Sequence, residues 1–289
     1  APQLKHRTHT LADAAYGARR FILGLSKKVL LANVLYELIS AYKSAANVSV
    51  LFVWLYAAAY VLHLYFDFSG YSDMAIGLGR IFGFHFIENF NYPYISASVT
   101  EFWRRWHMSL GSWFRDYVYI PLGGSKKGEG RTYLNLLVVW LFTGLWHGST
   151  LNFLLWGLFL FALISLERLG WGKVLRRSQV ISRLYMLLVI PLSWMLFAIP
   201  SLKDIGSYIG RLFAFSGGTA VHARDFLVYG RQYAVVLVIG LLVSTPLPEK
   251  LWRRIRTSPL GTVLLLVLFW VCVYCMAVAT NDPFMYFSF

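Results

Sequence analysis

The chain has 289 residues, of which 58% are hydrophobic and only 14% are charged. Soluble domains carry about 25% charged residues, so this composition excludes an ordinary soluble domain and indicates an all-α protein that crosses a membrane several times. The formal net charge is +14, but the cations lie in short clusters between apolar segments. Membrane topology imposes such a distribution, which argues against a nucleic-acid-binding protein.

The first third of the chain begins with a polar segment, residues 1–15, that is typical of a loop interior, so we expect the N-terminal part of a longer protein to be missing. The next segment, Tyr16–Ile39, predicts a helix at the membrane interface, because apolar runs are interrupted by four cations, Arg19, Arg20, Lys27 and Lys28. Val48–Phe66 predicts a membrane span. Residues 67–86 are rich in glycine and predict a short or broken helix lining a cavity.

The middle of the chain contains an amphipathic segment, Thr100–Ile120, that predicts one helix capped by the Thr100 hydroxyl. After a loop, the stretch Tyr133–Leu166 carries no charge. A helix over this stretch would be about 50 Å long at ~1.5 Å per residue, too long for one upright span. We therefore expect it to be tilted, or broken near Gly144, Gly148 and Ser149.

Three further spans are predicted, at Ile181–Ile199, Phe226–Val243 and Leu260–Ala279. The loops 168–183 and 245–258 are basic, so the positive-inside rule places them in the cytoplasm. The stretch that contains His147 would then run from outside to inside. Cys272 and Cys275 lie in the last span, and two cysteines alone predict packing on one helix face more readily than a zinc site, which needs about four ligands.

His107 is expected to face the interior of the protein. On a continuous helix, six side chains share an arc of roughly 100°: Trp103, Trp106, Leu110, Trp113, Phe114 and Tyr117. His107 falls on the margin of this arc, whereas Arg105 and Arg115 lie on the opposite side. The pattern leaves two readings open, a structural hydrogen bond to a backbone carbonyl and a reacting group.

His147 lies inside the uncharged stretch, on the flank of a GxxxG motif formed by Gly144 and Gly148. Ionisable side chains in a bilayer are costly and usually functional, and imidazole titrates near neutral pH. An interhelical hydrogen bond explains such a residue equally well, so spacing alone leaves both readings open. For His63, in the preceding span, a structural hydrogen bond is favoured.

The acidic residues do not predict a paired-carboxylate site. Asp67 and Asp73 would lie about 120° apart on a helix, which argues against a glycosidase-type pair. Each remains a candidate for orienting a histidine or fixing a helix break. The sequence contains no GxSxG, Walker A or HExxH motif.

Three segments resemble the membrane-bound O-acyltransferase (MBOAT) family: FDFSGYSDMAIGLGRIFGF, ENFNYPYISASVTEFWRRWHMSLGSWFRDYVYIPLGG and LNLLVVWLFTGLWHGSTLNFLLWG. The resemblance covers essentially the whole chain, including the terminal NDPFMYFSF, and is most specific over residues 66–157. Within the family it is strongest to bacterial alginate and peptidoglycan O-acetyltransferases. The teichoic acid D-alanylation branch shares similar segments, but YIPLGGSKKGEGRTYLN departs from it. The chain resembles the C-terminal part of such a protein.

This resemblance implies a single MBOAT-like membrane domain over residues 1–289, a helical bundle with a central cavity or tunnel and amphipathic interfacial helices. It implies a multi-pass protein of the bacterial inner (cytoplasmic) membrane, in contact with membrane lipid. The implied reaction transfers acetyl from acetyl-CoA, without a tightly bound cofactor or metal, towards hydroxyls of an exported alginate-like or peptidoglycan polysaccharide. An extracytoplasmic acetyltransferase partner protein is also implied, and nucleic acid is not.

The resemblance assigns the catalytic role to His147, as general base, and a second role to His107, in oxyanion stabilisation or substrate holding. Trp103, Trp106 and Trp113 are expected to wall the cavity, and Asn152 and Asp73 are weaker candidates for orienting roles. Two alternatives stay open: D-alanyl transfer to teichoic acid by the same fold, and a non-enzymatic transporter of an acyl group or glycan.

Overall fold

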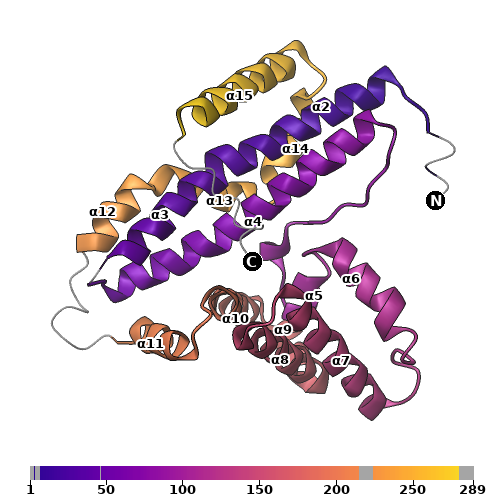
Figure 1. The fold of residues 1–289 in the computed structure, drawn as a ribbon, viewed down its shortest axis with the longest axis vertical. Coiled ribbons are helices and arrows are strands. Elements are labelled where there is room, and N and C mark those ends of the chain that lie inside the picture. The colour runs from indigo at the N-terminus through magenta and orange to yellow at the C-terminus, as the bar shows by residue number, and fades with distance from the viewer. Residues whose placement is uncertain (1–2, 4–6, 46, 215–223, 280–289) are drawn as a thin grey trace. The chain divides into compact units, whose positions relative to one another are not determined.

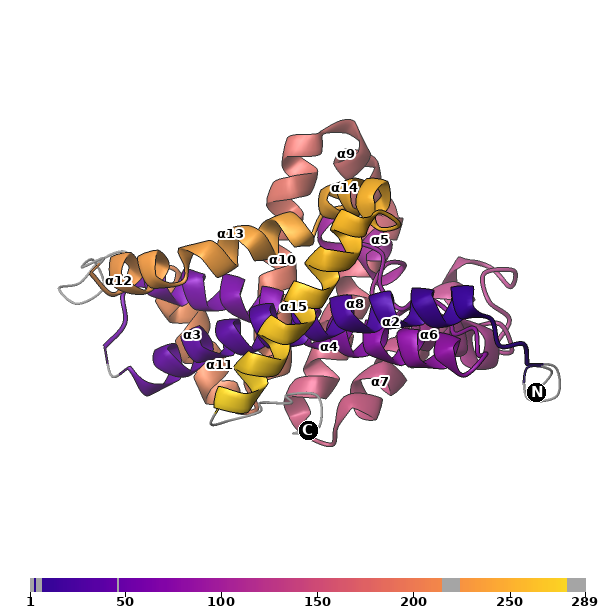
Figure 2. The same ribbon diagram turned by 90° about the horizontal axis from the view of Figure 1, so that it is seen from above.

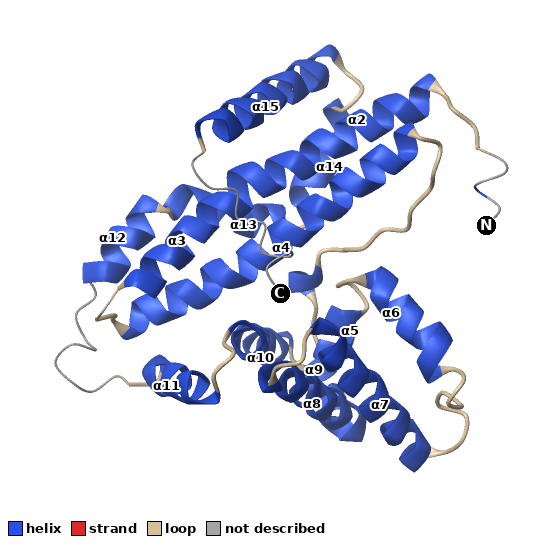
Figure 3. Ribbon diagram, viewed as in Figure 1, coloured by secondary structure: helices blue, strands red, loops and turns tan. Residues whose placement is uncertain are grey.

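The computed structural model describes residues 3, 7–45, 47–214 and 224–279, and within these residues it is helical with no strand (Figure 3). The terminal NDPFMYFSF lies outside the described residues. The chain divides into two compact units. The first unit comprises residues 1–46, 59–89 and 224–288, and the second comprises residues 47–58 and 90–223. Each unit is described by itself below.

The first unit begins with three helical segments that continue one another (Figure 1): α2 (Leu11–Ser26), the π-helical η1 (Lys27–Ala32) and α3 (Asn33–Ser44). The Thr10 hydroxyl caps α2 by accepting a hydrogen bond from the Asp13 amide, as expected for a threonine at a helix N-terminus. A π-helical turn inside a longer helix is uncommon and often marks a functional position.

The fourth helix, α4 (Val50–Ile81), is continuous over 32 residues. The prediction of a short or broken helix over residues 67–86 was therefore wrong. The glycines that suggested a break are contact points, since a Cβ on Gly24 would lie 2.6 Å from the Gly70 carbonyl oxygen. Gly17, seven residues before Gly24, approaches Gly77, seven residues after Gly70, in the same way. The glycines thus let the backbones of α2 and α4 touch.

The cations of the N-terminal segment bind the carboxylates of α4. The Lys28 Nζ lies 2.5 Å from an Asp67 carboxylate oxygen, and the two side chains are only 3% and 2% exposed. Asp73 binds Arg20 at 2.6 Å and Lys27 at 2.7 Å. A carboxylate in an apolar span needs a compensating charge, and these pairs supply it within the first unit.

The first unit is completed by the C-terminal helices α12 (Arg224–Gln232), α13 (Ala234–Val243), α14 (Leu247–Ile255) and α15 (Pro259–Val278). Helices α12 and α13 meet at an angle of 64°. Helix α15 lies alongside α2 (Figures 1 and 2). Its buried Cys272 packs against Leu25 and Val29, with Cys275 beside them, so these cysteines do pack on one helix face.

The second unit contains an antiparallel hairpin, formed by α7 (Glu129–His147) and α8 (Leu151–Leu166). The predicted break in the uncharged stretch is confirmed. Because the two arms run in opposite directions, this stretch does not form one continuous tilted helix. A Cβ on Gly144 would lie 2.5 Å from the Phe153 carbonyl oxygen, so this glycine permits the close approach of the arms. Arg168 and Glu129 pair at the open end.

The segment Thr100–Ile120 is not the single helix that its periodicity predicts. It comprises α5 (Val99–Trp103), α6 (Met108–Phe114) and the π-helical η3 (Arg115–Tyr119). The chain breaks between α5 and α6, and Ser98 rather than Thr100 caps α5. The unit also contains four short or apolar elements: η4 (Glu167–Trp171), α9 (Gly172–Arg177), α10 (Gln179–Ala198) and α11 (Leu202–Leu212).

Among the described residues, four helices are long and apolar enough to cross a membrane, or up to five if α12 and α13 form one bent span. The four are Val50–Ile81, Leu151–Arg177, Gln179–Ala198 and Pro259–Val278. These helices confirm the spans predicted at Val48–Phe66, Ile181–Ile199 and Leu260–Ala279. The bent pair corresponds to the span predicted at Phe226–Val243. The protein is therefore an all-α, multi-pass membrane protein.

Candidate active site

His147 is the last residue of α7, at the turn of the hairpin. Gly148 follows in an extended conformation, and α8 begins at Leu151. A Cβ on Gly148 would lie 2.5 Å from the Phe153 ring, so a larger residue there would push Phe153 away from the turn. The glycine after the histidine therefore ends the helix and lets the returning chain fold back against it.

Aromatic rings surround the His147 imidazole. Its ring centroid lies 5.2 Å from Trp156 at 90° and 5.0 Å from Phe197 at 83°. Trp146 and Phe153 lie 4.9 Å and 6.3 Å away. No described residue forms a hydrogen bond with the His147 ring, so the interhelical hydrogen bond that spacing allowed is not what holds it. Its orientation comes from ring packing, which leaves the ring nitrogens available for chemistry.

Asn152 fixes the turn that carries His147. Its Oδ1 accepts a hydrogen bond from the Thr150 hydroxyl at 2.6 Å, and its Nδ2 donates to the Phe197 carbonyl oxygen at 3.0 Å. The side chain is 1% exposed. Asn152 thus ties the start of α8 to the end of α10 and orients the turn without touching the imidazole.

His107 belongs to the break between α5 and α6. Its backbone is left-handed, with φ 46° and ψ 53°, a conformation that costs a non-glycine residue of order 1–3 kcal/mol. The ring lies 6.0 Å from Trp146, the neighbour of His147. Burial and, to a smaller extent, the nearby His147 lower the pKa of His107 to about 3. The imidazole is therefore neutral at pH 7, and the structure brings the two predicted histidines together.

The other aromatic candidates separate into two groups. Trp103 and Trp106 contact Trp194, at 6.0 Å and 4.8 Å between ring centroids, so they belong to the aromatic cluster next to His147. Trp113 is 52% exposed, because the break at His107 turns α6 away from the direction that a continuous helix would follow. The shared arc predicted for Trp103, Trp106 and Trp113 was therefore wrong.

Two of the remaining candidates lie in the first unit. Asp73 binds Arg20 and Lys27 there, so its carboxylate neutralises cations. His63 is fully buried, and its Nδ1 lies 2.8 Å from the Ala32 carbonyl oxygen. That contact is the structural hydrogen bond favoured for His63.

The sequence analysis missed Glu167, whose buried carboxylate holds the start of α5. It accepts hydrogen bonds from the Val99 amide at 2.6 Å, the Thr100 amide at 3.0 Å and the Thr100 hydroxyl at 2.6 Å. Two residues of α10 hold the preceding backbone: Ser182 donates to the Ala97 carbonyl, and Arg183 donates to Ile95 and Ser96. Glu167 thereby links the end of α8 to the segment that carries His107. An acidic residue directly after an apolar run was the available signal.

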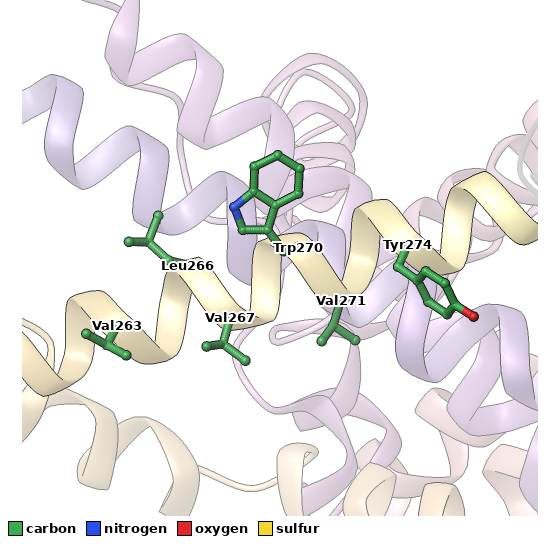
Figure 4. A pocket seen from close by; sticks show the side chains of 6 residues that line it. All are labelled: Val263, Leu266, Val267, Trp270, Val271 and Tyr274. Atoms are coloured by element: carbon green, nitrogen blue, oxygen red, sulfur yellow. The ribbon is translucent and has the colours of Figure 1, made fainter.

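A shallow apolar depression lies on α15 (Figure 4). Its lining comes from this one helix: Val263, Leu266, Val267, Trp270, Val271 and Tyr274. Most of these side chains are more than half exposed, and the lining contains no Asp, Glu, His, Lys or Arg. This face suits contact with lipid tails.

The sequence matches the family described as MBOAT, membrane-bound O-acyltransferase family, over residues 5–206. It is 36% identical to a probable alginate O-acetylase of Pseudomonas putida, over 99% of this chain and 64% of that protein. It is 33% identical to a peptidoglycan O-acetyltransferase of Helicobacter pylori, over 78% and 45% of the two chains. A shorter match, 37% identical over 36% and 28%, joins it to a teichoic acid D-alanyltransferase of Bacillus subtilis.

The chain spans less than two thirds of the length of each of these relatives. The match to the family nevertheless includes both histidines, the hairpin and the segment that Glu167 holds. The chain therefore belongs to the membrane-bound O-acyltransferase family.

Proposed function

We propose that this protein transfers acetyl from acetyl-CoA towards hydroxyl groups of an exported cell-surface polysaccharide, of the alginate or peptidoglycan kind. The observation that carries the proposal is the His147 imidazole, held at the hairpin turn by aromatic rings, with no hydrogen bond from a described residue, and close to His107. A histidine whose only role was to join helices would form a hydrogen bond from a ring nitrogen to a neighbouring helix. The names of the relatives that cover most of the chain support acetyl as the group transferred.

In the proposed reaction, a ring nitrogen of His147 takes the proton from the attacking hydroxyl. The hydroxyl oxygen forms a bond to the thioester carbonyl carbon, and the carbon–sulfur bond then breaks. The proton passes from His147 to the departing thiolate, so coenzyme A leaves as a thiol. His107, which is neutral at pH 7, donates an N–H to the developing oxyanion or to a substrate oxygen.

The surrounding residues have supporting roles in this proposal. Trp103 and Trp106 exclude water from the thioester, which limits wasteful hydrolysis, and Asn152 holds the turn. We assign no part of the reaction to Trp113, which is exposed, or to Asp73, which binds cations. The protein would act in the bacterial inner membrane, where cytoplasmic acetyl-CoA meets an exported glycan, and would pass acetyl to an extracytoplasmic partner protein or to the glycan itself.

The test compares His147→Ala with His63→Ala in the full-length protein, in membranes supplied with radiolabelled acetyl-CoA and, in separate reactions, alginate oligosaccharides or peptidoglycan fragments. We expect His147→Ala to abolish transfer and His63→Ala to retain it, at equal membrane expression. Full activity in His147→Ala would overturn the mechanism. Activity with D-alanyl donor alone would favour teichoic acid modification, and glycan export without release of coenzyme A would favour a transporter.

A further inference from the structure

The aromatic cluster of the second unit contains buried donors that no described residue satisfies. Trp103, Trp156 and Trp194 each have a buried indole N–H without a hydrogen-bond partner in the described part of the chain. Their ring centroids lie 5.5 Å apart for Trp103 and Trp156, 6.1 Å for Trp156 and Trp194, and 6.0 Å for Trp103 and Trp194. Three mutually contacting rings therefore carry three unsatisfied donors.

Such a grouping is costly in a folded protein. A buried N–H that lacks an acceptor destabilises the folded state, and the large majority of buried side-chain polar atoms have a partner. Phenylalanine would give a comparable apolar ring at each position without this cost. The indoles are therefore better explained by an acceptor atom that enters the cluster with a ligand.

The position of Trp156 indicates what that ligand does. Trp156 is fully buried, and its ring stands perpendicular to the His147 imidazole at 5.2 Å between centroids. It also contacts Phe197, another ring that packs nearly perpendicular to His147. The Trp156 ring, which carries the unsatisfied N–H, therefore adjoins the imidazole on which the proposed chemistry depends. The rest of the cluster is apolar, which suits a thioester better than a hydrated sugar.

We propose that this cluster binds the acyl thioester donor and that Trp156 is a further catalytic residue, whose indole N–H donates to the thioester carbonyl oxygen. This inference rests on the proposed function. As the acceptor hydroxyl attacks, the carbonyl π electrons move to this oxygen, and the N–H stabilises the charge until the carbon–sulfur bond breaks and the electrons return. Trp103 and Trp194 supply the neighbouring donors and confine the acyl group. The bonds that form and break belong only to the donor and the acceptor, and the proton moves through His147 as in the proposed function.

The experiment replaces Trp156 in the full-length protein with phenylalanine and, separately, with benzothienylalanine, an isostere that has sulfur in place of the N–H. The matched control is Trp171→Phe. Trp171 also has a buried indole N–H to which no described residue is paired, but its ring contacts Tyr185 outside the cluster. Initial rates of coenzyme A release are measured with acetyl-CoA at several concentrations, together with the melting temperature in detergent and the activity of His147→Ala.

We expect both Trp156 variants to lower kcat about 100-fold, as for loss of one oxyanion donor, with KM for acetyl-CoA close to that of the wild type and a melting temperature equal to or above it. Trp171→Phe should keep its kcat. A benzothienylalanine variant with wild-type kcat, or one in which only KM or the melting temperature changes, would overturn the catalytic role of Trp156. Either result would leave the proposed function standing if His147→Ala is inactive. Activity in His147→Ala would instead refute the proposed function itself.

Discussion

The ion pair between Lys28 and Asp67 allows a direct test of how buried charge stabilises the first unit. Replacing Asp67 with leucine removes the carboxylate 2.5 Å from a Lys28 ammonium that is 3% exposed. Losing one partner of a buried pair costs about 3–5 kcal/mol of unfolding free energy. For a chain of this size, each kcal/mol lowers the melting temperature by about 2–4 °C, so we expect a fall of about 6–20 °C.

The double variant Lys28→Met/Asp67→Leu removes both charges and keeps similar side-chain volumes. Replacing a whole buried pair with apolar residues is often neutral or stabilising, so we expect the double variant to recover most of the lost stability. The difference between the summed single effects and the double effect gives the coupling energy of the pair. We expect several kcal/mol for it.

The assay is the melting temperature of the full-length protein in detergent, read by size-exclusion chromatography after heating. The control is the exposed pair Arg253 and Glu249, whose side chains are 65% and 41% exposed. Exposed pairs contribute about 0–1 kcal/mol, so Glu249→Leu should change the melting temperature by only a few degrees. An Asp67→Leu effect no larger than this control, or single effects that simply add in the double variant, would refute the reasoning.

Three other perturbations have defined outcomes. Gly144→Ala puts a methyl group 2.5 Å from the Phe153 carbonyl oxygen, so we expect the hairpin to be disrupted and the yield of folded protein to fall. Glu167→Gln removes the charge that holds α5, and we expect a loss of about 1.5–3 kcal/mol of unfolding free energy and lower acetyl transfer. Because the pKa of His107 is lowered to about 3, the unfolded chain binds this proton first. Stability should therefore fall as the pH drops from about 6.5 towards 3, and less so in His107→Gln.

Each of these outcomes has its own control. Gly130→Ala adds a methyl group with no atom within 4 Å, and equal yields for the two glycine variants would contradict the close approach of α7 and α8. For Glu167, the control is Glu129→Gln, which removes an exposed pairing with Arg168; equal losses would remove the special role of Glu167. For His107, the same pH dependence in wild type and His107→Gln would show that other groups control acid sensitivity.

The spans and the break in the hairpin were predictable because they depend on local properties of the chain. About 20 consecutive apolar residues are needed to cross the hydrocarbon region, and the windows that meet this condition became α10 and α15. The break near Gly148 follows from the same length limit. The inward position of His147 was predictable as well, since the glycines beside it mark a face in contact with another helix.

The features that sequence analysis missed depend on distant parts of the chain. A helical projection assumes one unbroken helix, and the left-handed backbone at His107 invalidates it for Trp113. Periodicity likewise gave no sign that Lys28 would find Asp67, 39 residues away. Glu167 was not predicted as a site residue, because the backbone amides that its carboxylate binds lie 67 and 68 residues earlier in the chain.

The left-handed backbone at His107 has a consequence for selection experiments. Glycine adopts this conformation without steric cost, so His107→Gly should relieve strain while removing the imidazole. A library of variants selected only for heat resistance should therefore enrich glycine at position 107, and the survivors should be the least active members. Natural proteins often keep such a trade-off between stability and activity at working positions. The residue found at position 107 would thus show whether a selection had favoured thermal stability or catalytic activity.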